Sequence, residues 1–165
     1  METASLMVAI LSLVISIIAL VCSAIASNVA NRISAKDLNV SYATIELDMR
    51  RSINEASVRV SELSLQMRPL ITRLESGTIT GEERNQLSAL ERSFTAATEN
   101  YLNVYDELCG KYIDSKIDKV RFRKSFNFEV RNLVEREALK TFFDPTTSRY
   151  KAILRVYDEW ENLEK

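Results

Sequence analysis

Residues 6–26 read LMVAILSLVISIIALVCSAIA, a stretch that contains no charged residue, no proline and no glycine. At about 1.5 Å per residue, a helix of this length measures roughly 32 Å, which is enough to cross the hydrocarbon core of a bilayer. No comparable stretch occurs elsewhere in the 165 residues. The sequence therefore predicts one transmembrane helix within residues 1–30, with the remainder of the chain in water.

Small residues in and around this stretch recur at alternating intervals of four and three positions. Large aliphatic residues fill most of the other positions. The small-residue positions, called the seam below, are Ser5, Ala9, Ser12, Ser16, Ala19, Ser23, Ala26 and Ala30. In lipid, helix association depends on close backbone approach and on interhelical hydrogen bonds, both of which serine and alanine permit. We therefore predict a homo-oligomer joined through the seam, and favour it over an anchor that merely tolerates small residues.

The charges that flank the apolar stretch predict its orientation. Only Glu2 precedes it, whereas Arg32 and Lys36 follow it. Because lysine and arginine are retained on the cytoplasmic side, the N-terminus is expected outside and the C-terminal part in the cytoplasm. Residues 24–26 (Ala-Ile-Ala) resemble a signal-peptidase site, and Cys22 resembles a lipoprotein cysteine. We disfavour both alternatives, since no basic residue precedes the apolar run and the residues before Cys22 fit the lipoprotein pattern poorly.

The apolar pattern continues beyond the span and predicts a long amphipathic helix over residues 31–76. Apolar residues from Leu38 to Leu74 recur at intervals of three or four, as one face of a helix requires. Two arrangements remain open: a coiled-coil stalk shared between protomers, or the first helix of a bundle. Four further apolar residues widen the face and favour packing within a bundle near Pro69; they are Val40, Leu47, Val58 and Leu65.

Helix boundary signals predict three more helices in residues 77–165. Thr80-Gly81-Glu82-Glu83 is a capping box after a glycine-containing turn, Asp118 is a suitable N-cap, and Pro145 ends one helix before the last. Helices joined by short connections favour an antiparallel bundle. The predicted fold is all-α: an N-terminal transmembrane helix, a long juxtamembrane helix, and a small cytoplasmic bundle that packs with part of residues 31–76.

Composition excludes several classes of function. A formal charge of −1 and a pI near 5.7 argue against binding to nucleic acid, which requires a basic excess. The chain has no histidine, which is the commonest general base and metal ligand, and none of the sequence motifs of nucleotide binding or nucleophilic catalysis. Its two cysteines cannot form a structural framework and fit a reducing compartment. We expect no enzyme activity, no catalytic or metal site and no cofactor.

One basic cluster is a candidate surface for lipid or partner contact. It surrounds Phe122 and consists of Lys116, Lys119, Arg121, Arg123 and Lys124. Such a cluster can meet anionic lipid headgroups or an acidic protein. The alternative, which we favour, is that Phe122 faces the core while the charges are solvated. We likewise expect the aromatic residues near the C-terminus to form core and not a ligand site; they are Phe142, Phe143, Tyr150, Tyr157 and Trp160.

Three segments of the C-terminal half carry a resemblance to known proteins. They are residues 101–105 (YLNVY), 116–118 (KID), and 150–160, which begin with YKAI and end with YDEW. This part resembles a group of uncharacterised bacterial single-span helical membrane proteins, some of which are encoded beside phage-defence genes. The resemblance implies a bacterial inner-membrane protein whose cytoplasmic bundle recognises a protein partner. It carries over no catalytic residue.

Two functions therefore follow from the sequence. The first is a non-enzymatic single-pass membrane protein that self-associates through the seam and presents its bundle for protein–protein interaction. The alternative is an oligomeric effector, for example of phage defence, that forms pores in the membrane or disrupts it. In this alternative, seam hydroxyls line a polar path. Those hydroxyls belong to Ser5, Ser12, Ser16 and Ser23.

Overall fold

The computed structural model describes residues 2–163, and it describes side chains for residues 19–163. Every element in this part of the chain is helical: α1 (Glu2–Glu75), α2 (Gly81–Ile113), α3 (Lys119–Glu135), the short 3₁₀ helix η1 (Glu137–Phe142) and α4 (Lys151–Leu163). The all-α prediction is confirmed. The chain divides into two compact units, residues 1–43 and residues 44–165.

The first unit consists of the N-terminal part of α1. Its large aliphatic residues are exposed from Leu20 through Val29 to Ile33. Among residues 19–163, no helix combines the length and apolarity that a membrane crossing requires. Residues 6–18, which make up most of the predicted span, lie outside the part whose side chains are described.

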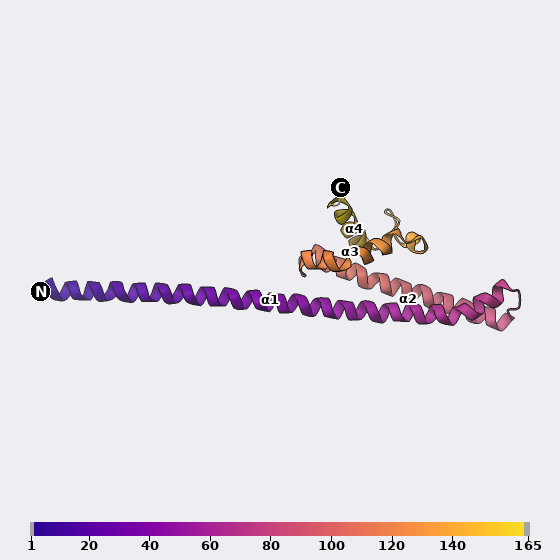
Figure 1. Cartoon of the computed structure of the whole chain (residues 1–165), viewed down its shortest axis with the longest axis horizontal. Coiled ribbons are helices and arrows are strands. Elements are labelled where there is room, and N and C mark those ends of the chain that lie inside the picture. Colours follow the sequence, from indigo (N-terminus) through magenta and orange to yellow (C-terminus); the bar gives the residue numbers. More distant parts are fainter. Residues whose placement is uncertain (1, 164–165) are drawn as a thin grey trace. The chain divides into compact units, whose positions relative to one another are not determined.

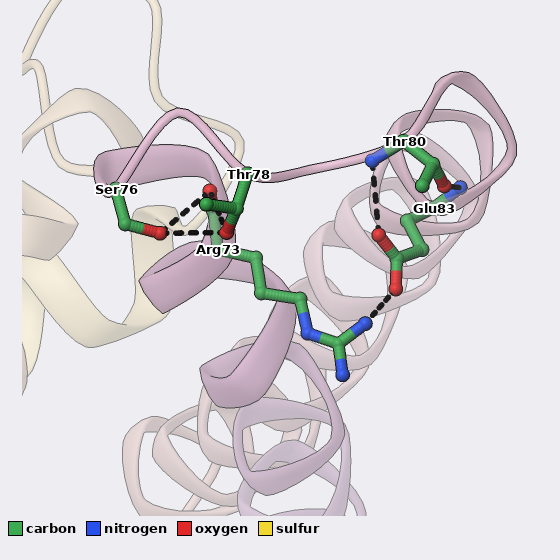
Figure 2. Close-up of polar contacts among 5 residues, drawn as sticks. All are labelled: Arg73, Ser76, Thr78, Thr80 and Glu83. Carbon is green, nitrogen blue, oxygen red and sulfur yellow. Dashed lines mark hydrogen bonds and ion pairs between the residues drawn. The ribbon is translucent and has the colours of Figure 1, made fainter.

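In the second unit, a tight turn reverses the chain between α1 and α2 (Figure 2). Gly77 adopts a φ of 70°, the left-handed conformation that glycine reaches without steric cost, and the Thr78 amide donates to the Arg73 carbonyl at 3.0 Å. The predicted capping box is present: the Glu83 amide donates to Thr80 Oγ1 (3.2 Å), and the Thr80 amide donates to Glu83 Oε2 (2.9 Å). An ion pair between Arg73 and Glu83 closes the turn.

Helix α2 runs back antiparallel to the part of α1 that belongs to this unit. Figure 1 shows α2 running alongside α1 in the opposite direction. Arg73 and Glu83 meet at one end of the pair, and Lys111 Nζ lies 3.6 Å from Met49 Sδ towards the other. Four residues of α1 are buried at intervals of seven: Met49, Ala56, Leu63 and Leu70. A heptad spacing keeps one face of a helix directed at its neighbour. Pro69 lies inside α1 and does not end it.

The widened apolar face predicted for α1 is wrong. Val40, Leu47, Val58 and Leu65 are exposed, so they do not take part in the bundle core. Two residues along an α-helix turn the side chain by about 200°, and Leu47, Val58 and Leu65 each lie two positions from a buried residue of the heptad face. These three side chains therefore point away from α2.

The core of the second unit joins α2, α3 and α4. Leu102, Leu108, Val130, Ile153 and Val156 have no exposed surface. Helix α4 packs on both α2 and α3, and η1 packs on α3. The helical-bundle prediction is confirmed, whereas η1 was not expected. The connection it forms is held by backbone hydrogen bonds at its ends, from Leu139 to Arg136 and from Phe143 to Lys140.

Candidate functional site

The basic cluster lies at the start of α3, where local polar contacts fix the chain. Ser115 adopts a φ of 58°, and the Lys116 amide donates to the Lys111 carbonyl at 2.9 Å, which ends α2. Asp118 then opens α3 as predicted, because its carboxylate accepts a hydrogen bond from the Arg121 amide at 3.0 Å. Local hydrogen bonds therefore fix both the end of α2 and the start of α3.

Phe122 faces the core, as the favoured interpretation expects. Its ring centroid lies 4.8 Å from that of Phe126, 5.3 Å from that of Tyr112 and 5.7 Å from that of Trp160. Tyr112 donates a hydrogen bond to Glu159 Oε1 (2.7 Å) and accepts one from Trp160 Nε1 (3.2 Å). Burial, together with the bond to Glu159, raises the pKa of the Tyr112 hydroxyl. This cluster holds α2, α3 and α4 together.

The other aromatic residues near the C-terminus also belong to the core, as predicted. Phe143, Tyr150 and Trp160 are buried, while Phe142 and Tyr157 are partly buried against them. Tyr150 packs against both phenylalanines, with ring centroids 5.9 Å from Phe143 and 6.3 Å from Phe142. The prediction of core packing is confirmed.

Basic side chains of the cluster contact groups of their own chain, among them Lys116, Lys119 and Arg121. Lys116 Nζ lies 3.0 Å from Asp114 Oδ2, and Arg121 Nε lies 2.8 Å from Glu46 Oε2 on α1. Lys119 Nζ lies 5.0 Å above the Tyr112 ring, a cation–π distance. These contacts tie α3 to its neighbours and neutralise part of the positive charge. A shallow hollow on α3 is lined by Val120, Arg123, Lys124 and Asn127.

The outer face of α3 also exposes two apolar side chains that sequence reasoning missed. Val120 is 82% exposed and Phe128 is 74% exposed. Each lies four residues from Lys124, so the three side chains share one face of the helix. That face lies opposite the buried stripe of Phe122, Phe126, Val130 and Leu133. The signal was available in the sequence, since Val120 and Phe128 lie eight residues apart on the face of the helix opposite the apolar stripe.

The carboxylates that could suggest a metal or acid–base site have structural partners. Asp106 Oδ1 accepts hydrogen bonds from the amides of Ala152 (3.0 Å) and Ile153 (3.1 Å), so α2 supplies a cap for the N-terminus of α4. Glu107 pairs with Lys111 on the same helix. Within the described part of the chain, no group of three or more potential ligands could hold a metal ion.

A small apolar cavity lies where α1, α2 and η1 meet. Its volume is about 220 Å³, and its walls include Val60, Phe94, Leu139 and Phe142. Thr98 also lines it, and the buried hydroxyl of Thr98 has no hydrogen-bond partner. An unsatisfied buried hydroxyl costs free energy, so Thr98 lowers the stability of the fold.

The seam can be followed only in part. Ala19, Ser23, Ala26 and Ala30 are exposed on α1, whereas Ser5, Ala9, Ser12 and Ser16 lie outside the residues whose side chains are described. The two cysteines differ: Cys22 is exposed, whereas Cys109 is fully buried and burial raises the pKa of its thiol. The Cys109 thiol is therefore inaccessible in the folded chain.

Comparison of the chain with protein-family models, with curated proteins and with solved structures gives no match.

Proposed function

We propose that the chain is a non-enzymatic, single-pass protein of a bacterial inner membrane, and that it self-associates through the seam. Residues 6–26 form the span, the N-terminus lies outside, and the bundle lies in the cytoplasm. There the bundle binds a protein partner. No cofactor is required.

One observation carries this proposal: the uncharged stretch lies within the same helix as the first helix of the bundle. Helix α1 extends from Glu2 to Glu75. A helix satisfies its backbone hydrogen bonds internally, which is the condition for crossing lipid. The basic residues Arg32 and Lys36 follow the stretch and support the cytoplasmic placement of the bundle.

The outer face of α3 is the proposed contact with the cytoplasmic partner. Exposed aromatic and aliphatic side chains beside basic ones are typical of protein–protein interfaces, in which aromatic anchors and arginine are enriched. Phe128 and Val120 would supply the anchors, while Lys124 would select a partner with acidic residues around an apolar groove. The remaining positive charge also fits anionic lipid headgroups, which share the acidic chemistry.

Disulfide crosslinking in native membranes tests the proposal. The parent variant carries Cys22→Ser and keeps the buried Cys109. Ser16→Cys on the seam should form disulfide dimers, whereas Ile15→Cys, one position away, should not. When a second seam cysteine is added to Ser16→Cys, a product that stops at dimer supports a paired anchor, and a ladder that reaches higher oligomers supports the pore-forming alternative. Equal crosslinking at both positions would contradict association through the seam, and loss of the chain from membranes on alkaline washing would contradict the span.

A further inference from the structure

Helix α1 exposes a series of large apolar side chains that its own chain does not cover. In the first unit, Ile33 is 55% exposed and Val40 is 65% exposed. In the second unit, Leu47, Val58 and Leu65 are 68%, 47% and 64% exposed. We call these five residues the outer stripe. Exposed leucine, isoleucine and valine in a regular series indicate a surface that another helix covers.

The outer stripe continues the register of the seam. From Ser5, steps of four and three residues reach Ala30, and the same alternation continues to Leu65. All five residues of the outer stripe fall on it. Of the exposed large apolar residues between positions 31 and 65, only Leu38 falls elsewhere. A spacing that averages 3.5 residues is the signature of a left-handed coiled coil.

The buried face of α1 uses other positions of the same heptad. When the register residues occupy positions a and d, Met49, Ala56, Leu63 and Leu70 all fall on position f, on the far side of the helix. Intramolecular packing against α2 and association through the outer stripe are therefore compatible, because they use opposite faces of the helix.

We propose that a second copy of this chain covers the outer stripe as a parallel, in-register coiled coil. This inference rests on the proposed self-association, and it extends that association from the seam into the water-exposed part of α1. Asn54 falls on position d of this register, between Leu47 and Val58. In a parallel, in-register pair it faces Asn54 of the second copy, and the two side-chain amides can hydrogen-bond to each other.

Charges beside the outer stripe favour the parallel orientation. Asp48, Glu55 and Glu62 fall on position e, along one edge. An antiparallel pair would bring this acidic edge against the same edge of its partner, which is repulsive. A parallel pair instead places the acidic edge beside position g of the second copy, which holds Arg50, Ser57 and Ser64 and no acidic residue. Arg51 also falls on the register, where its ion pair with Glu55 (3.1 Å) keeps its charge at the rim of the contact.

Cysteine crosslinking of the full chain in native membranes tests this proposal. In the Cys22→Ser parent, Leu47→Cys and Leu65→Cys are made separately, with Arg59→Cys as the control. All three native side chains are exposed, so the substitutions leave the core intact. A parallel pair brings each outer-stripe cysteine beside the same cysteine of the second copy. We therefore expect about fivefold more disulfide dimer than for Arg59→Cys, whose side chain points away from the outer stripe.

Two positions are needed because they define the orientation. Leu47 and Leu65 lie 18 residues, or about 27 Å, apart along α1. In an antiparallel pair, only one of these two positions can lie beside the same position of the second copy. Crosslinking at one position alone therefore overturns the parallel arrangement. Crosslinking no greater than at Arg59 for both positions overturns the interface itself.

The Ser16→Cys variant separates this inference from the proposed function. Crosslinking at Ser16 without crosslinking at the outer stripe leaves self-association through the seam intact and refutes the extension. Crosslinking at the outer stripe without crosslinking at Ser16 supports the coiled coil and refutes the seam.

Discussion

The two faces of α1 between residues 44 and 75 carry similar apolar side chains with opposite surroundings. On one face, Leu63 is 3% exposed and packs within the second unit; on the other, Leu65 is 64% exposed. Both are leucines on the same helix, two positions apart. Apolar character by itself therefore does not show that a face of α1 is buried. The position of the residue relative to α2 decides whether its side chain packs within the second unit.

The largest expected effect separates these two leucines. Leu63→Ala should lower the free energy of unfolding of the full chain in mild detergent by about 2–4 kcal/mol, since it removes buried methyl groups and leaves a cavity. Leu65→Ala should change it by less than about 0.5 kcal/mol under conditions where the chain is monomeric. Denaturant unfolding followed by circular dichroism measures both. Equal losses would show that the two faces are covered alike and would contradict the description of α1 given above.

A smaller effect is expected from the corresponding comparison of two adjacent carboxylates on α2. Asp106→Ala should lower the free energy of unfolding by about 1–2 kcal/mol, because the N-terminal amides of α4 lose their acceptor. Glu107→Ala, the matched control, removes only an exposed ion pair with Lys111 and should cost about 0.5 kcal/mol or less. The same unfolding measurement applies. A similar cost for both variants would mean that Asp106 does not cap α4.

The smallest predicted effect has the opposite sign. Thr98→Val replaces a buried hydroxyl that has no hydrogen-bond partner by a methyl group of similar size. It should raise the free energy of unfolding by about 1 kcal/mol, because the desolvation cost of the hydroxyl disappears. Thr95→Val, at an exposed position one turn away on α2, is the control. Destabilisation by Thr98→Val would indicate that the hydroxyl has a partner in solution.

The sequence by itself determined the helical content and most of the helix boundaries. Gly77, the capping box at Thr80 and the N-cap Asp118 act through hydrogen bonds to residues within a few positions, so local sequence is sufficient to place them. The burial of Phe122 also followed from the periodicity of α3. The uncharged stretch and the seam are likewise features of sequence alone.

Only the tertiary structure decided which apolar faces are buried and which polar groups are shared between helices. Val58 and Leu65 look like core residues in the sequence, yet α2 lies on the other side of α1. Asp106 caps a helix that begins 45 residues later, at Lys151, and Tyr112 bonds to Glu159 and Trp160. These contacts join residues far apart in the chain, and their formation depends on how the helices pack, which periodicity within one helix does not specify.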